Sequence, residues 1–303
     1  MKLSHIRDVL AVAEHGSLRA AARQLDVAQP AITRSIRELE DELGATLFER
    51  HAKGVRLTEM GEAFVRRATT VDTELRRARD EIAQLKGRHQ GEVSVVMSSG
   101  PSVALLPSAF AAFHRRYPDV VLKLSENFFP AIQGDLAAGR IDFYVGPVEA
   151  PLAMPQFAMD QLYENTRAVL ARKGHPLVGK RSLADLAGAR WVRATLSAGG
   201  SDSVFESMFE AQGLPVPRVT LHARSNLHTL LAVANSDLLA IVPRQWAELP
   251  VVASLFDRIE LDHALPASPV YLVRRHEMPL TPLAERFSDL VRRAALNYDR
   301  EAG

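Results

Sequence analysis

Residues 17–43 read SLRAAARQLDVAQPAITRSIRELEDEL, and the rest of the chain is organised around them. Apolar residues recur at helical spacing before Asp26 and again after Gln29, which predicts two short helices. Pro30 lacks an N–H and clashes with a preceding turn, so it fits the first turn of a helix but not the interior. We therefore expect one helix to end near Asp26 and another to begin near Gln29. Such a helix-turn-helix offers its second helix to the major groove of DNA.

The flanking segments extend this unit on both sides. Residues 4–15 form a predicted helix that Ser4 can cap and Gly16 can end. Two short β-like segments surround the turn at Lys53 and Gly54, which predicts a winged hairpin. Together they predict a winged helix-turn-helix over residues 1–58. The expected DNA contacts lie in the N-terminal half of the second helix and in the hairpin: Gln29, Pro30, Ala31, Thr33, Arg34, Arg37, Arg50, Lys53 and Arg56.

Charge limits which part of the second helix can read DNA. Its C-terminal half carries four carboxylates, so only its N-terminal half is expected to approach phosphates closely. Arg can bond guanine with two N–H groups, and Gln can do the same with adenine. The alternative is that these are solvated polar positions with no role in DNA binding.

A long helix is predicted over residues 58–87, with Thr58 as its cap, because apolar residues repeat at alternating spacings of four and three. A monomer would leave so narrow a stripe exposed to water, so we expect residues 59–88 to form a linker and dimerisation helix. Packing of the stripe on its own winged domain is the alternative. A dimer would present two recognition helices to two half-sites. The stripe consists of Phe64, Ala68, Val71, Leu75, Ala78, Ile82 and Leu85.

From residue 92 onward, β-branched strands alternate with helices, which predicts an α/β domain with a parallel sheet over residues 91–303. The alternation occurs in two sets. We expect lobe I to comprise about residues 91–162 and 267–303, and lobe II about residues 163–266. Two such lobes usually hold a small ligand between them, at the ends of their strands.

Composition narrows the class of protein further. The net charge of +1 means that any nucleic-acid contact must come from a local basic patch. The absence of cysteine excludes disulfides and thiolate metal sites. The N-terminal residues lack the apolar core of a signal peptide, and no apolar run approaches the ~20 residues of a membrane span. We therefore expect a cytoplasmic protein with no membrane partner, and no cofactor or metal is predicted.

The segment AARQLDVAQPAITRSIRELEDELGATLFERHAKGVRLTEMGE at residues 21–62 resembles the N-terminal sequence of LysR-type transcriptional regulators. Later segments such as LAAGRIDF, GHPL and AVANSDLLAIVP resemble the effector domain of that family more loosely. The resemblance implies a periplasmic-binding-protein-like effector domain and a homodimer or homotetramer without enzymatic activity. It also implies promoter binding that changes with a small-molecule effector, and RNA polymerase is a further expected partner. Ala28 departs from the family, which often has a capping Ser or Thr there, and a lost cap costs about 1 kcal/mol.

The predicted effector site centres on residues 98–102, where a strand turns into a helix. Free N–H groups and neighbouring hydroxyls favour an anion there, and the resemblance puts the effector at the same turn. We expect a small organic acid, an aromatic or aliphatic carboxylate or sulfonate. Ordinary loop capping is the alternative at each position. The candidates are Ser98, Ser99, Gly100, Pro101, Ser102, Asn127, Phe128, Gly146, Pro147, Thr195, Ser197, Ser225, Asn226 and Ile241.

Two other interpretations fit parts of the chain. Residues 174–181 have the glycine and lysine spacing of a phosphate-binding loop, but Arg181 stands where that motif needs Ser or Thr. The α/β segment by itself would also suit a solute-binding or enzymatic protein with an N-terminal oligomerisation segment. The winged helix-turn-helix favours a DNA-binding regulator instead.

Overall fold

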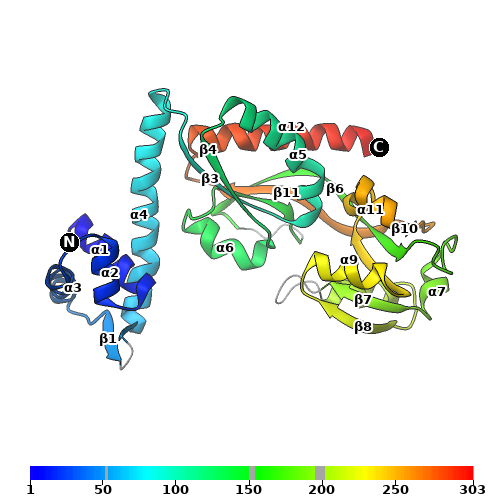
Figure 1. Ribbon diagram of the computed structural model, residues 1–303, viewed down its shortest axis with the longest axis horizontal. Helices are drawn as coiled ribbons and strands as arrows, with labels where there is room; N and C mark the ends of the chain where they lie inside the picture. The colour runs from blue at the N-terminus through cyan, green and yellow to red at the C-terminus, as the bar shows by residue number, and fades with distance from the viewer. Residues whose placement is uncertain (52–53, 150–153, 195–201, 303) are drawn as a thin grey trace. The chain divides into compact units, whose positions relative to one another are not determined.

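The computed structural model describes residues 1–51, 54–149, 154–194 and 202–302 (Figure 1). Two compact units make up the chain. The first, which we call the winged unit, comprises Met1–Lys86 and Ala138–Arg140, and the second, the sheet unit, comprises Gly87–Ala137 and Ile141–Gly303. In the described ranges, no helix is long and apolar enough to cross a membrane.

The winged unit is a helical bundle with a two-stranded wing. Its core is formed by apolar residues of all three short helices, among them Val9, Ala21 and Leu39, and by Leu47 just before the wing. In chain order, the elements are α1 (Leu3–His15), α2 (Leu18–Gln24), α3 (Gln29–Leu43), β1 (Phe48–His51), β2 (Gly54–Leu57) and α4 (Glu59–Leu85).

The helix ends agree with the sequence in part. Gly16 ends α1 in the left-handed conformation, with φ of 61°, but Ser4 does not cap it, because the helix begins one residue earlier, after Lys2. Helix α2 ends at Gln24 rather than near Asp26, which itself takes the left-handed conformation. Helix α3 begins at Gln29 with Pro30 in its first turn, as predicted, and Ala28 provides no side-chain cap.

Helix α3, the wing and α4 meet at Leu47. Glu40 Oε1 accepts hydrogen bonds from the N–H groups of Leu47, at 2.6 Å, and Phe48, at 3.2 Å. The Leu47 carbonyl accepts the N–H of Thr58 at 3.0 Å, and the Thr58 hydroxyl accepts the N–H of Gly61 at 2.9 Å. A Cβ on Gly61 would lie 2.1 Å from the Leu47 oxygen, so only glycine allows this approach. The junction therefore fixes the wing against the recognition helix.

The sheet unit contains a 9-stranded sheet in the order β4-β3-β5-β11-β6-β9-β7-β8, with β10 paired to β6. Strand β6 connects the two halves: its first part pairs with β11, and its last part pairs with β9 and β10. The strands are β3 (Gly91–Met97), β4 (Val120–Ser125), β5 (Phe143–Pro147), β6 (Phe157–Arg172), β7 (Arg190–Ala194), β8 (Arg218–Ala223), β9 (Leu238–Pro243), β10 (Phe256–Ile259) and β11 (Leu265–Arg275).

The predicted all-parallel sheet is wrong at its centre. Strands β4, β3 and β5 are parallel, as are β8, β7 and β9. However, β11 runs antiparallel to β5 and β6, and β6 runs antiparallel to β9. The reversal follows from the path of the chain, because the long strands β6 and β11 carry it from one half to the other and back.

Helices cover each half of this sheet and enclose separate cores (Figure 1). In the first core, Phe113 of α5 and Phe287 of α12 pack edge to face at 5.1 Å. In the second, Trp191 packs against Phe205 and Phe209. The helices are α5 (Ser99–Arg116), α6 (Phe129–Ala137), α7 (Leu183–Leu186), α8 (Asp202–Glu210), α9 (Asn226–Ala234), α10 (Arg244–Ala247), α11 (Pro250–Leu255) and α12 (Pro282–Ala302).

Candidate nucleic-acid interface and ligand cleft

The N-terminal half of α3 presents a polar face to solvent. Gln29, Arg34 and Arg37 are exposed, as are Pro30 and Ala31. Thr33 is half-buried, and its hydroxyl donates to the Gln29 carbonyl at 3.1 Å. Most of these residues line a surface groove, together with two acidic residues further along the helix. The groove is lined by Gln29, Pro30, Thr33, Arg34, Arg37, Glu38 and Asp41.

The acidic half of α3 makes contacts within the winged unit. Glu38 lies 3.6 Å from Lys2 Nζ and 3.5 Å from His5 Nε2. Glu42 pairs with the N-terminal ammonium, whose hydrogen bond holds the pKa of that carboxyl below its usual value. Glu40 accepts hydrogen bonds at the start of the wing. Glu38, Glu40 and Glu42 therefore each contact a neighbouring segment of the winged unit.

The wing places its arginines on both strands. Arg56 is exposed on β2, where it is opposite Glu49 of β1. Arg50 is on β1 opposite Val55. Lys53 lies outside the described residues.

The apolar stripe of α4 divides into two parts. Phe64 packs against the core of the winged unit and Ala68 is buried, which fits packing on its own domain. Val71, Leu75 and Ala78 are exposed instead. Farther along, the exposed fractions rise to 55% at Ile82 and 73% at Leu85. The sequence did not predict this division.

In the sheet unit, a cavity of about 220 Å³ opens where α5 begins. A Cβ on Gly100 would lie only 3.0 Å from Gln245 Oε1 and 3.2 Å from Pro243 Cβ, so glycine lets the first turn of α5 approach α10. Helix α5 begins at Ser99, within the predicted turn from strand to helix at residues 98–102, which puts Ser99 and Gly100 in its first turn. Of the residues predicted from sequence, those on the cavity wall are Ser98, Ser99, Gly100, Pro101, Phe128, Pro147, Asn226 and Ile241.

The other predicted positions have local roles. The Ser102 hydroxyl donates to the Ser98 carbonyl at 3.0 Å, and Asn127 Oδ1 accepts the N–H of Phe128 at 2.8 Å. Ser225 caps α9 by accepting the N–H of His228. A Cβ on Gly146 would lie 2.1 Å from the hydroxyl oxygen of the buried Tyr144, so this glycine serves packing. Thr195 and Ser197 lie outside the described residues.

Five polar residues on the wall were not predicted from sequence: Glu149, Asn165, Arg167, Thr229 and Ser268. Asn165 Oδ1 accepts a hydrogen bond from Gln245 Nε2 at 3.1 Å. Burial lowers the pKa of Arg167, and the charge of Glu149 opposes that shift. Ser98 also lines the cavity, and its buried hydroxyl lies close to the hydroxyl of Tyr144. The cavity wall therefore combines one cation, one carboxylate and a buried hydroxyl.

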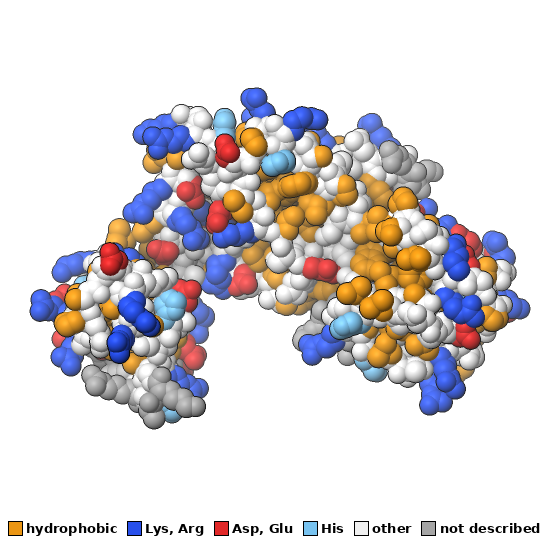
Figure 2. Space-filling model, in the orientation of Figure 1, with side chains coloured by type: hydrophobic (Ala, Val, Ile, Leu, Met, Phe, Trp, Pro, Cys, Tyr) orange, Lys and Arg blue, Asp and Glu red, His pale blue; other side chains and the backbone are white. Residues whose placement is uncertain are grey.

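Apolar side chains are also exposed on the surface of the sheet unit. They include Phe110 of α5, Val121 of β4, and Leu227 and Leu231 of α9. The exposed fraction is 63% at Leu227 and 54% at Leu231. On the face drawn in Figure 2, hydrophobic side chains gather over the sheet unit. Contiguous apolar surface of this kind is typical of protein–protein interfaces.

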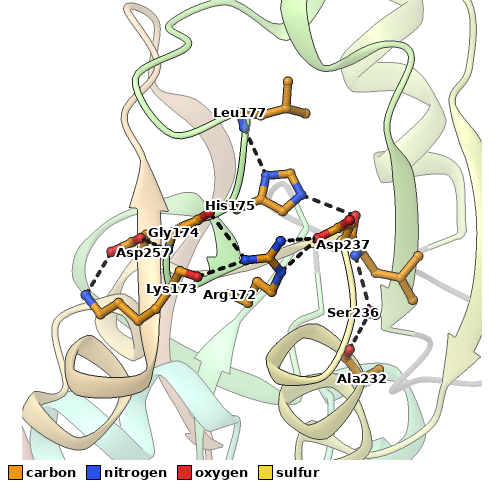
Figure 3. A network of polar contacts seen from close by, with 10 residues as sticks. Arg172, Lys173, Gly174, His175, Leu177, Ala232, Ser236, Asp237 and Asp257 are labelled. Atoms are coloured by element: carbon orange, nitrogen blue, oxygen red, sulfur yellow. Dashed lines mark hydrogen bonds and ion pairs between the residues drawn. The ribbon is translucent and has the colours of Figure 1, made fainter.

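The loop at residues 174–181 has a structural role (Figure 3). His175 is buried, its Nδ1 accepts the N–H of Leu177 at 3.1 Å, and its Nε2 faces the Asp237 carbonyl at 3.3 Å. Asp257 accepts from Lys173 and from the N–H of Gly174, which lowers the pKa of its carboxyl. The loop cation Arg181 pairs with Asp262 at 2.6 Å. These contacts hold the loop against its neighbours.

A winged helix-turn-helix joined to a two-lobed α/β domain with a ligand-sized cavity defines the class of ligand-responsive DNA-binding regulators. Two family descriptions match the chain: "Bacterial regulatory helix-turn-helix protein, lysR family" over residues 3–62 and "LysR substrate binding domain" over residues 86–296. The chain belongs to the LysR family of transcriptional regulators, which bind DNA, carry an effector-binding domain and are not enzymes. This membership decides against the solute-binding or enzymatic alternative.

Individual relatives agree with this assignment. The HTH-type transcriptional regulator GbpR of Azospirillum brasilense is 30% identical over 252 residues, which cover 82% of this chain and 73% of that protein. The HTH-type transcriptional regulator PcaQ of Agrobacterium fabrum is 29% identical over 286 residues, covering 94% and 92% of the two chains. Among solved structures, full-length CbnR in complex with its target DNA has a TM-score of 0.71 at 24% identity, covering 97% of this chain and 100% of that one.

Proposed function

We propose that the chain binds promoter DNA as a homodimer, with the N-terminal half of α3 reading bases and the wing contacting the phosphate backbone. The observation that carries this proposal is the exposed groove of Gln29, Arg34 and Arg37. Glu38 and Asp41 line the same groove, so phosphates are expected at its N-terminal part, where Arg34 and Arg37 lie. The relative CbnR is known in complex with its target DNA. Promoter DNA lies in the bacterial cytoplasm, where the protein would act, with RNA polymerase as a further partner.

The exposed part of the α4 stripe supports the homodimer. Ile82 and Leu85 leave apolar surface that a second copy of the same helix can cover at heptad spacing. The apolar face of the sheet unit offers a second contact, which would allow two dimers to join as a tetramer. A dimer positions two α3 helices for two half-sites of one operator.

The cavity at the start of α5 is the proposed effector site, and its ligand is a small organic anion. The N–H groups in the first turn of a helix attract negative charge, and Ser98 and Ser99 add hydroxyl groups beside them. Calorimetry with a panel of carboxylates and sulfonates on wild type and Ser99→Ala tests this assignment. We expect weaker binding in the variant, and unchanged affinities for every ligand would refute the site.

Two arginine variants test the DNA interface. Arg34→Ala should lose discrimination between operator and random DNA, because a bidentate contact to a base carries about 1–3 kcal/mol of specificity. Arg56→Ala, on the wing, should weaken binding to both DNAs about equally. The same prediction holds for Lys53→Ala. Equal losses on both DNAs for Arg34→Ala would reject its role in reading bases.

A further inference from the structure

Arg167 occupies an unusual position in the sheet. It lies in the part of β6 that pairs with both central neighbours, opposite Leu265 of β11 and opposite Pro243 of β9. Its side chain is half-buried and lines the cavity. The middle of a sheet therefore brings a permanent cation to the floor of the ligand site.

The charge of Arg167 has no direct partner among the described residues. Three other partly buried arginines of the sheet unit are paired with carboxylates: Arg193 with Glu206 at 2.7 Å, Arg172 with Asp237 at 2.6 Å and Arg292 with Asp160 at 2.9 Å. Arg167 has only the longer-range attraction of Glu149 at the exposed rim. Removing a cation from water without a paired anion is costly, so the arrangement indicates an anion that the ligand supplies.

The opposite wall provides a second polar contact. Ser98 is 2% exposed, and its buried Oγ lies close to the hydroxyl of Tyr144. It immediately precedes α5, whose first turn also lines the cavity. A hydroxyl has one donor and two acceptor positions, so Oγ can also bond a ligand oxygen in the cavity.

Between these polar groups, the wall is mainly apolar. Phe128, Val148 and Ile241 line it from three different segments, together with several prolines. The volume of about 220 Å³ exceeds that of an engineered cavity that binds benzene, about 150 Å³. One aromatic ring with a single charged substituent therefore fits. A second carboxylate would face Glu149, which disfavours a dianion.

We propose that Arg167 is the specificity-determining residue for an aromatic monocarboxylate, which it binds through its guanidinium group while the ring lies against Phe128 and Ile241. The Ser98 hydroxyl bonds the same ligand from the α5 side. The inference rests on the proposed function of the cavity as the effector site, and it names the chemical class of that effector.

Calorimetry on the full-length protein with benzoate, benzamide and phthalate tests the proposal. Benzoate should bind, whereas benzamide, which has the same shape without the charge, and phthalate, which has a second carboxylate, should each bind at least tenfold more weakly. Arg167→Gln should weaken benzoate at least tenfold, and Arg167→Lys should recover part of the loss. Glu149→Gln should improve phthalate binding. Arg190→Gln, a change at an exposed arginine of β7, should leave all three affinities unchanged.

The outcomes separate a ligand contact from a structural role. Thermal unfolding without ligand should be unchanged or occur at higher temperature in Arg167→Gln, because the variant removes a half-buried charge that has no paired carboxylate among the described residues. Equal binding of benzoate and benzamide, unchanged benzoate affinity in Arg167→Gln, or no benzoate binding at millimolar concentration would each overturn the proposal. A gel shift on the same preparations without ligand reports DNA binding separately, so failure of the DNA-binding proposal is distinguished from failure of this one.

Discussion

Replacing Gly61 by alanine should disrupt the junction between the recognition helix, the wing and α4. The new Cβ would lie 2.1 Å from the carbonyl oxygen of Leu47 and 3.0 Å from its carbonyl carbon. Ordinary van der Waals contact begins at 3.4 Å. The obstacle is backbone, and its oxygen also accepts the N–H of Thr58 at 3.0 Å, so relief requires moving a hydrogen-bonded segment. Overpacking usually costs 1–3 kcal/mol, and we expect about 3 kcal/mol here.

Urea unfolding of the full-length protein measures this effect. Far-UV circular dichroism follows both units, whereas tryptophan fluorescence follows the sheet unit alone, because Trp191 and Trp246 both belong to it. Gly61→Ala should lower the stability of the winged unit, whose unfolding circular dichroism detects and tryptophan fluorescence does not. The variant should also abolish the gel shift. The matched control is Gly134→Ala in α6, where the added Cβ meets no described atom within 4 Å and should stabilise the helix by about 0.5–1 kcal/mol. Wild-type unfolding and DNA binding in Gly61→Ala would refute the reasoning.

Three further predictions concern the dimer, the pH dependence of stability and the wing. Ile82→Glu should convert dimers to monomers in sedimentation velocity, because it places a charge on the exposed stripe of α4; an unchanged sedimentation coefficient would contradict this. Burial, aided by Glu248, raises the pKa of Tyr298 to about 12, so the stability it contributes is present below about pH 10 and is lost as the pH rises to about 12. The free energy of unfolding should therefore fall less between about pH 9 and about pH 11 in Tyr298→Phe than in wild type, and equal falls would be contrary evidence. Glu40→Ala removes the acceptor of two wing N–H groups and should cost about 1–3 kcal/mol in urea unfolding, whereas the exposed Glu38→Ala should cost less than about 1 kcal/mol; equal costs would argue against the wing contact.

The local parts of the fold were predictable from sequence. Pro30 fixes the start of α3 because its ring is compatible only with a first turn, and Gly16 and Thr58 mark helix ends through their own backbone and hydroxyl chemistry. The start of α1 was less predictable, since the unfavourable N-cap Lys2 precedes it in place of Ser4. Interactions within a few residues determined these outcomes, and a single sequence contains them.

The centre of the sheet was not predictable in the same way. The first part of strand β6, which begins at Phe157, is only partly buried and does not alternate between polar and apolar residues, so periodicity marks it weakly. Its antiparallel pairing with β11 depends on residues about a hundred positions apart in the chain. Local periodicity does not contain that pairing.

The same limit explains which residues of the candidate site the sequence predicted and which it missed. The turn at Ser98 and Ser99 was found because a strand followed by a helix has a recognisable pattern. Arg167 was missed, since its significance comes from the lack of a directly paired carboxylate among the described residues, and the pairing of β6 with β9 and β11 decides which side chains surround it. Ser102 and Ser225 show the converse, because their hydroxyls are used within their own helices.

The most direct test of DNA-binding regulation is a gel shift with the intergenic DNA upstream of the chain's own gene, with random DNA of equal length as competitor. We predict a complex that resists the competitor and that weakens steeply as salt rises, because phosphate contacts release counterions. A complete absence of any competitor-resistant complex at low salt, with every upstream fragment tried, would contradict the account.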